Sequence, residues 1–201
     1  GRTLMLNGHT DVVPPGDQAA WSADPFVPRR VTIDGRECIV GRGACDMKGG
    51  LVAAWEALRI VDRSGVILRG DVVLCPVSGE EDGGMGTFAA LDQLLTRDGM
   101  RIDGCIVPEP TDLDLVPANG GALTFRLRVP GAAIHASRRA EGVSAIEKFI
   151  PILNALTDLE SSRNADVDPL MKRWPIAYPL SIGTVHAGDW ASTVPDLLIA
   201  E

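Results

Sequence analysis

The sequence has few aromatic residues, few cysteines and a shortage of basic residues. Aromatic side chains make up 4% of the 201 residues, too few for a platform on which nucleic-acid bases stack. The 27 acidic residues outnumber the 19 basic ones, and the net charge of −8 argues against nucleic acid or an anionic membrane as a partner. The four cysteines have no C-x-x-C spacing, which indicates neither a zinc ribbon nor a disulfide framework. We therefore expect a protein of the reducing cytoplasm.

Long apolar runs and a secretory signal are also missing. The best apolar stretch, Leu51–Val61, is interrupted by Glu56 and Arg59, and is shorter than the roughly eighteen residues that span a bilayer. No basic segment with a following hydrophobic region and cleavage site opens the sequence. The remaining composition, 45% hydrophobic and 23% charged, is that of an ordered globular protein with one large domain or two small ones.

Both ends of the sequence run through strand-like apolar segments. Leu4-Met5-Leu6 follows directly after Gly1-Arg2, and the last residues are Leu197–Glu201. Complete domains usually begin and end in polar segments. We therefore expect these residues to be an internal piece of a longer protein.

Residues 1–119 alternate between strand-like and helix-like patterns. This rhythm predicts an α/β fold with a mainly parallel sheet and flanking helices. In such sheets functional residues collect at the carboxyl ends of the strands. The predicted strands are Thr3–Asn7, Asp71–Val77 and Gly104–Val107, the predicted helices are Met47–Val61 and Met85–Leu95, and Asp17–Asp34 is predicted to be a loop.

Residues 120–201 have a different texture after the Gly120-Gly121 pair. Apolar and basic residues alternate over Leu123–Val129, which predicts a half-exposed strand. A helix over Glu141–Leu159 and strands over Ile176–Val185 and Val194–Ala200 complete the pattern. We expect part of a small α+β domain here, separate from the first.

Ionisable residues follow the three predicted strands of the first domain. His9 and Asp11 follow the first strand, Glu80 and Glu81 the second, and Glu109 the third. Acidic residues in a loop are most often simply solvated. At a strand-end crevice, however, neighbouring carboxylates repel each other unless a cation offsets their charge. One acid could then bind metal while its neighbour accepts a proton from water.

Asp46 lies in the glycine-rich segment Gly41–Gly50, at the start of a predicted helix. An N-cap would explain the aspartate structurally, but four surrounding glycines suggest tight backbone around something bound. The segment lacks the G-x-x-x-x-G-K-[ST] pattern of a phosphate-binding loop. One imidazole and several carboxylates on converging strand ends suit Zn²⁺, Mn²⁺ or Co²⁺.

Four motifs in order make the sequence resemble the co-catalytic zinc aminoacylase and carboxypeptidase family, which includes acetylornithine deacetylase, succinyl-diaminopimelate desuccinylase, aminoacylase-1 and carboxypeptidase G. The motifs are Gly8–Pro14, Gly41–Gly49, Ser78–Glu81 and Glu109–Thr111. The resemblance extends into the second domain, which is similar to the family's lid or dimerisation domain; the matching segments there are Ile134–Ser137, Gly142–Ile146, Gly183–Asp189 and Val194–Asp196.

The resemblance implies that residues 1–119 are part of a catalytic domain with a site for two divalent metal ions, most simply Zn²⁺, with Co²⁺ or Mn²⁺ as alternatives. His9 and Glu109 would bind one ion, Asp46 would bridge both, and Glu81 would hold the second. The family's last ligand, a histidine far toward the C-terminus, has no counterpart in these 201 residues. The peptide bond that follows the bridging acid, Asp46–Met47, would be cis.

The resemblance also implies three catalytic roles. Glu80 would be the general base, Asp11 would orient His9 from behind, and His135 would donate to the oxyanion, reaching the site of the partner subunit of a homodimer formed through the lid.

The expected function is therefore a metal-dependent amidohydrolase of N-acyl amino acids or small peptides. An exopeptidase of the same family and a non-catalytic binding protein that retains the fold are the alternatives. A nucleotide-binding domain is disfavoured because no phosphate loop is present.

Overall fold

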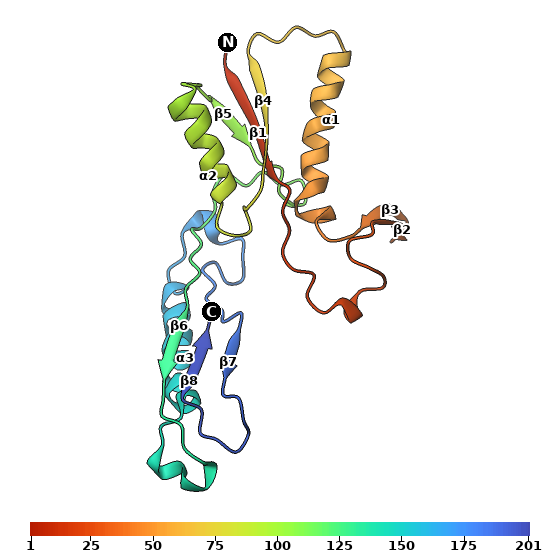
Figure 1. The fold of residues 1–201 in the computed structure, drawn as a ribbon. Coiled ribbons are helices and arrows are strands. Elements are labelled where there is room, and N and C mark those ends of the chain that lie inside the picture. The colour runs from red at the N-terminus through yellow and green to blue at the C-terminus, as the bar shows by residue number, and fades with distance from the viewer. The chain divides into compact units, whose positions relative to one another are not determined.

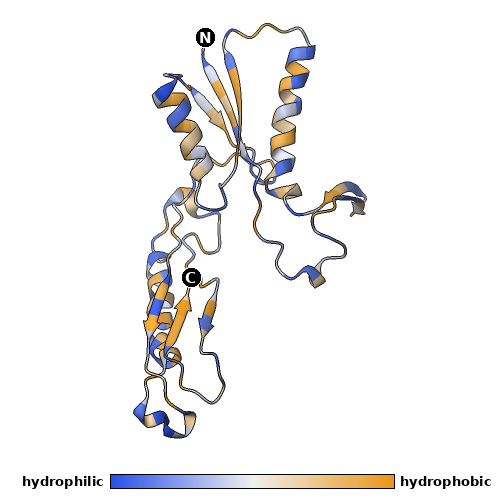
Figure 2. Ribbon diagram, viewed as in Figure 1, coloured by the Kyte–Doolittle hydropathy of each residue, from blue (hydrophilic) through white to orange (hydrophobic).

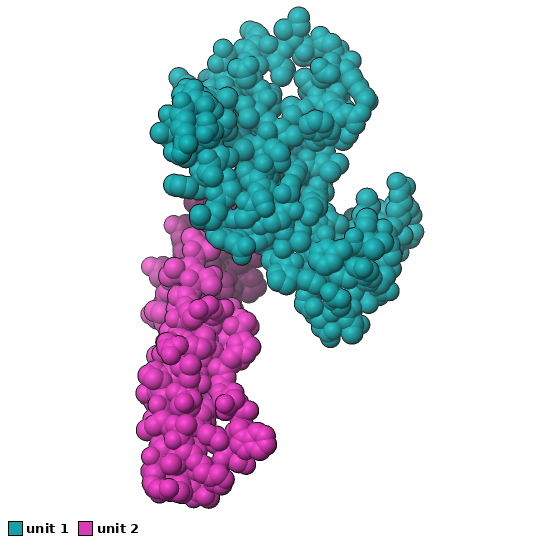
Figure 3. Space-filling view, in the orientation of Figure 1, with its two compact units in different colours: residues 1–115 teal, residues 116–201 magenta.

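The computed structural model describes all 201 residues, which form two compact units: unit 1, Gly1–Leu115, and unit 2, Val116–Glu201 (Figure 3). The sequence had suggested a boundary after residue 119. No helix in either unit is both long enough and apolar enough to cross a membrane.

Unit 1 is built on a parallel three-stranded sheet in the order β4-β1-β5 (Figure 1). The strands are β1 (Thr3–His9), β4 (Asp71–Val77) and β5 (Gly104–Ile106). Strand β1 pairs with β4 along its whole length, from Thr3 opposite Asp71 to His9 opposite Val77. The predicted α/β fold with a parallel sheet is confirmed, and the bounds of β4 are those expected from the sequence.

Two helices flank this sheet, α1 (Gly49–Arg63) and α2 (Met85–Leu91), and α2 continues into the π-helical turn η3 (Asp92–Arg97). Successive residues of a strand face opposite sides of the sheet. Met5 accordingly packs with Cys75 and Val77 against residues of α2 and η3. Gly8 faces the other side, where a Cβ would meet Met47 and Leu51 of the α1 side.

A hairpin of β2 (Arg29–Ile33) and β3 (Arg36–Val40) extends from unit 1. The loop predicted over Asp17–Asp34 is therefore wrong for its last third, and only the 3₁₀ turn η1 (Gln18–Ala20) interrupts the earlier part. The missed signal is Asp34-Gly35: both residues have positive φ, 50° and 76°, as the two-residue turn of a hairpin requires.

Unit 2 packs one helix on an antiparallel sheet in the order β6-β8-β7. The elements are β6 (Leu127–Pro130), the 3₁₀ turn η4 (Ala136–Glu141), α3 (Ala145–Arg163), the 3₁₀ turn η5 (Pro169–Met171), β7 (Val185–Ala187) and β8 (Leu197–Ala200). Its core is a set of apolar residues from α3 and the sheet: Val129, Ala145, Phe149, Leu198 and Ala200. Figure 2 shows the hydrophobic colour concentrated on β6 and β8.

The strand predicted over Ile176–Val185 is wrong except for its last residue, which begins β7. Pro179 lies inside the predicted run, and a proline lacks the N–H that a sheet ladder needs. Helix α3 begins four residues later than expected, because the Ser144 hydroxyl accepts a hydrogen bond from the Glu147 N–H and caps the helix there.

Candidate metal centre

His9 is the last residue of β1 and its side chain is 1% exposed. Its Nδ1 lies 3.0 Å from the backbone carbonyl oxygen of Asp11 and 3.5 Å from an Asp11 carboxylate oxygen. A carbonyl oxygen can only accept, so Nδ1 carries the proton and donates. When the ring is neutral, it therefore presents the lone pair of Nε2, which is the form in which imidazole binds a metal ion.

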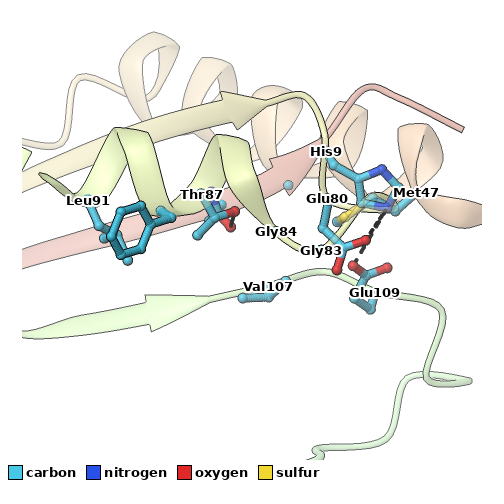
Figure 4. Close-up of a pocket in the computed structure, with 12 residues that line it drawn as sticks. His9, Met47, Glu80, Gly83, Gly84, Thr87, Leu91, Val107 and Glu109 are labelled. Carbon is cyan, nitrogen blue, oxygen red and sulfur yellow. Dashed lines mark hydrogen bonds and ion pairs between the residues drawn. The ribbon is translucent and has the colours of Figure 1, made fainter. Parts of the chain in front are cut away.

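Carboxylates surround Nε2 of His9. The nearest oxygens of Asp46, Glu109 and Glu80 lie 3.0, 3.8 and 3.9 Å away. One ligand atom from each of His9, Asp46 and Glu109 lies within 4.8 Å of the others. We call His9, Asp46, Glu80 and Glu109 the strand-end cluster; Figure 4 shows His9, Glu80 and Glu109 facing one another.

The parallel sheet explains why residues 100 positions apart meet here. His9 ends β1, Glu80 lies three residues beyond β4, and Glu109 lies three residues beyond β5. Because parallel strands end at the same edge, their following loops converge. The sequence thus predicts the meeting of these three side chains from strand ends alone.

Asp46 reaches the cluster from the π-helical turn η2 (Ala44–Lys48), which precedes α1. It does not cap α1, whose N-cap position is Lys48 and has no side-chain hydrogen bond. The Asp46–Met47 peptide bond is cis, as expected, and Met47 is fully buried. Gly50 is required by a close approach: a Cβ there would lie 1.9 Å from the Pro108 carbonyl oxygen, just before Glu109.

The carboxylates of the strand-end cluster shift the pKa values of its members. Burial, reinforced by the charges of Asp46, Glu80 and Glu81 and opposed by His9, raises the pKa of Glu109. Burial would lower the pKa of His9, but its hydrogen bonds to Asp11 and Asp46 and the nearby negative charges raise it instead. Neighbouring carboxylates contribute to both shifts, beside burial for Glu109 and hydrogen bonds for His9, and a divalent ion would offset their negative charge. The nitrogen and oxygen donors also suit such an ion.

Asp11 connects His9 to the acidic loop after β4. One carboxylate oxygen accepts the Glu81 backbone N–H at 3.2 Å. Burial raises the pKa of Asp11, but backbone hydrogen bonds, that of Glu81 first, outweigh it and leave the pKa below its usual value. Asp11 therefore remains a carboxylate behind the ring of His9.

Besides Asp11, two predicted site residues lie outside the strand-end cluster. The half-buried Glu81 contributes its backbone N–H to Asp11, and its carboxylate is not among the three clustered ligands. His135 is an exposed residue of unit 2, where its Nδ1 accepts the Ser137 N–H at 3.2 Å.

A cavity of about 480 Å³ extends from the strand-end cluster along α2, and its far end contains residues that the sequence analysis missed (Figure 4). Asn7, 6% exposed, donates to the Cys75 carbonyl and accepts from the Thr87 hydroxyl, and both Asn7 and Thr87 line the cavity. A polar residue ending the apolar run Leu4–Leu6 is the signal that could have identified Asn7.

Comparisons with known proteins agree with this architecture. Residues 5–184 match the model of peptidase family M20/M25/M40. Succinyl-diaminopimelate desuccinylase of Gluconacetobacter diazotrophicus is 34% identical over an alignment of 201 positions, which covers 96% of this chain and 49% of that protein. N-formyl-4-amino-5-aminomethyl-2-methylpyrimidine deformylase of Bacillus subtilis is 32% identical, with 96% of this chain and 45% of that protein covered. The chain thus spans about half the length of the curated relatives it matches.

Solved structures share the fold. The di-peptidase Dug1p of Saccharomyces cerevisiae superposes with a TM-score of 0.62 at 19% identity, covering 99% of this chain and 52% of that one. Human carnosine dipeptidase 1 gives a TM-score of 0.55 at 18% identity, with the same coverage of both chains. With the match to the family model over most of its length, the chain belongs to peptidase family M20/M25/M40.

Proposed function

We propose that the protein is a co-catalytic metallohydrolase that cleaves the amide bond of N-acyl amino acids or small peptides. One observation carries the proposal: in a chain of this family, His9, Asp46 and Glu109 bring ligand atoms within 4.8 Å of one another, with a Glu80 oxygen 3.9 Å from His9 Nε2. A deacylase is preferred to an exopeptidase, because relatives above 30% identity include a desuccinylase and a deformylase.

We assign the metal ligands as the resemblance implies. His9, Asp46 and Glu109 would hold one ion, and Asp46 and Glu81 would hold a second. The two ions would be Zn²⁺, with Co²⁺ or Mn²⁺ as substitutes. Asp11 fixes the ring of His9 through the contact at Nδ1, which leaves Nε2 for the metal.

The bound ions would lower the pKa of a shared water and polarise the substrate carbonyl. Glu80 then acts as general base: it takes the proton of the attacking water and returns it to the leaving amine. Its side chain is 45% exposed and is not one of the three clustered ligands, so it is free to exchange a proton with substrate.

His135 supplies a donor to the developing oxyanion. Because Nδ1 accepts the Ser137 N–H, the proton of the neutral ring is on Nε2, which is then available to donate. We place this residue in the active site of a partner subunit, in a homodimer formed through unit 2. The four free cysteines support the cytoplasm as the location.

A substrate panel tests the proposal directly. The full-length protein, stripped with chelator and reloaded with Zn²⁺, Co²⁺ or Mn²⁺, is assayed with N-acetyl, N-succinyl and N-formyl amino acids and with dipeptides. We expect hydrolysis of at least one N-acyl amino acid that disappears in Glu80→Gln and persists in the matched control Asp82→Asn, an exposed acid of the same loop. Metal-loaded protein that hydrolyses none of these amides would contradict the proposal.

A further inference from the structure

The loop from Thr10 to Pro28 joins β1 to β2 and has only the short turn η1 as regular structure. It begins directly after His9 and contains Asp11, whose carbonyl oxygen contacts the His9 ring. A flexible loop of this length would lose considerable conformational entropy on being fixed. Contacts outside the strand-end cluster must therefore hold it in place.

Both ends of the loop lie against the short segment Gly41–Gly43. At the later end, the Arg42 backbone N–H donates to the carbonyl oxygen of the buried Pro25 at 2.8 Å. At the earlier end, Val12 lies against Gly43 so closely that a Cβ on this glycine would be 2.6 Å from the Val12 side chain. Gly43 also has a φ of +81°, which favours glycine.

The side chains of Arg42 and Trp21 bind the middle of the loop. The Arg42 guanidinium lies 5.2 Å from the centre of the Trp21 ring and donates to the Pro14 carbonyl at 3.2 Å. The Trp21 indole N–H donates to the neighbouring Pro15 carbonyl at 2.9 Å. Both side chains are partly buried, where a cation–π contact is stronger than at an exposed position. We call this arrangement the Trp21–Arg42 clamp.

The clamp lies close in sequence to the regions that position both His9 and Asp46, the two residues that make the shortest contact in the strand-end cluster. His9 Nε2 and the Asp46 carboxylate are 3.0 Å apart. The chain runs from Asp11 behind His9 to Pro14 and Pro15 in three and four residues, and from Arg42 to Asp46 in four. Holding Arg42 against Pro14 would therefore restrict how far Asp11 and Asp46 can move relative to each other.

We propose that Trp21 and Arg42 are positioning residues that set the metal affinity of the strand-end cluster by holding Asp11, and through it the His9 ring, against Asp46. The proposal rests on the proposed function, since it assumes that His9 and Asp46 bind metal. Residues that orient metal ligands from behind commonly change affinity by about 10- to 100-fold when removed.

The test is a Co²⁺ titration of the metal-free full-length protein, followed by visible absorption, in Arg42→Ala, Trp21→Ala and the conservative variants Arg42→Lys and Trp21→Phe. Unit 2 offers a matched control pair, because the Arg173 guanidinium lies the same 5.2 Å from the Trp174 ring. We expect the Kd for Co²⁺ to rise at least tenfold in the two alanine variants, with an altered absorption band and an unchanged thermal unfolding curve.

Trp21→Phe retains the aromatic face and Arg42→Lys retains the charge, so both should recover part of the affinity; they keep the test valid if an alanine variant fails to fold. Arg173→Ala and Trp174→Ala should bind Co²⁺ like the wild type. Co²⁺ binding that is lost in His9→Ala but changes less than twofold in the folded clamp variants would overturn the clamp proposal alone. Absence of His9-dependent Co²⁺ binding in the wild type would overturn the proposed function and the clamp with it.

Discussion

Unit 1 packs two helices and unit 2 one helix on a three-stranded sheet, and the two units bury different side chains. The buried polar residues of the chain, Asn7 and His9, are both on β1 of unit 1. The core of unit 2 is entirely apolar, with Phe149 and Leu198 among its members. Burying a polar side chain is costly unless it has a hydrogen-bond partner, and both residues have one: Asn7 contacts Cys75 and Thr87, and His9 contacts Asp11 and Asp46.

Strand direction accounts for this difference. The parallel strands of unit 1 deliver three loops to one edge, where acidic residues gather around His9. The antiparallel strands of unit 2 alternate in direction, and their ends lie at opposite edges. His135 lies before the turn η4, where its Nδ1 contacts Ser137, and it is not one of the clustered ligand residues. The parallel topology of unit 1 therefore brings candidate ligands together in a way that unit 2 does not.

The strongest test of this contrast is metal removal. Chelation of the full-length protein should abolish amide hydrolysis completely, and Zn²⁺ or Co²⁺ should restore it, because the proposed ions would activate the attacking water. Activity and metal content by elemental analysis are measured together. Turnover that continues in protein shown to be free of metal would contradict the proposal that unit 1 contains a catalytic metal site.

Replacing the proposed base should be nearly as damaging. Glu80→Gln keeps the size of the side chain but cannot take a proton, so kcat should fall by about 10²- to 10⁴-fold. Bound metal should stay near the wild-type level, whereas Asp46→Asn and Glu81→Gln should reduce it. If Glu80→Gln instead loses metal and keeps its activity per bound ion, Glu80 is a ligand and the roles are exchanged.

Subunit mixing tests what unit 2 contributes. His135→Ala should lower kcat by about 10²- to 10³-fold, as loss of an oxyanion donor does. Mixed dimers of His135→Ala and Glu80→Gln subunits would then contain one intact site, with activity far above either parent. Heterodimers shown to form without any recovery would place His135 in its own subunit's site or outside the mechanism.

Substitutions in the core of unit 2 are expected to affect the strand-end cluster least. Phe149→Ala should lower the free energy of unfolding by about 3–5 kcal/mol, while the metal content of the folded protein stays unchanged. Leu159→Ala, at an exposed position of the same helix, is the control and should cost far less. Chemical denaturation followed by circular dichroism measures both. A loss of metal from folded Phe149→Ala protein would show that unit 2 supports the site.

Much of this architecture could be predicted from the sequence, because burial leaves a local pattern. Strand β4 has an apolar run with sharp polar ends, and its bounds were predicted to the residue. The placement of His9, Glu80 and Glu109 followed from strand ends in a parallel sheet. The glycines around Asp46 indicate a backbone in close contact with its surroundings, and Gly50 is such a position because a Cβ there would clash with the Pro108 carbonyl oxygen.

Features that depend on long-range contacts could not be predicted in the same way. Whether Glu80 or Glu81 faces His9 depends on the loop after β4, where Gly79, Gly83 and Gly84 all have positive φ. Trp21 and Arg42 are 21 residues apart in the sequence, and nothing local indicates that they meet.

The start of α3 at Ala145, by contrast, could have been predicted from the sequence, because Ser144 and Glu147 have the spacing of a capping box at a helix N-terminus.

The central claim is that the strand ends of unit 1 form a metal centre, and an anomalous diffraction map tests it most directly. Crystals of the full-length protein grown with Zn²⁺ are measured above and below the zinc absorption edge. The account predicts a peak about 2.0–2.2 Å from His9 Nε2 and from carboxylate oxygens of Asp46 and Glu109. Stoichiometric zinc with its peaks elsewhere, and none at His9, would contradict it.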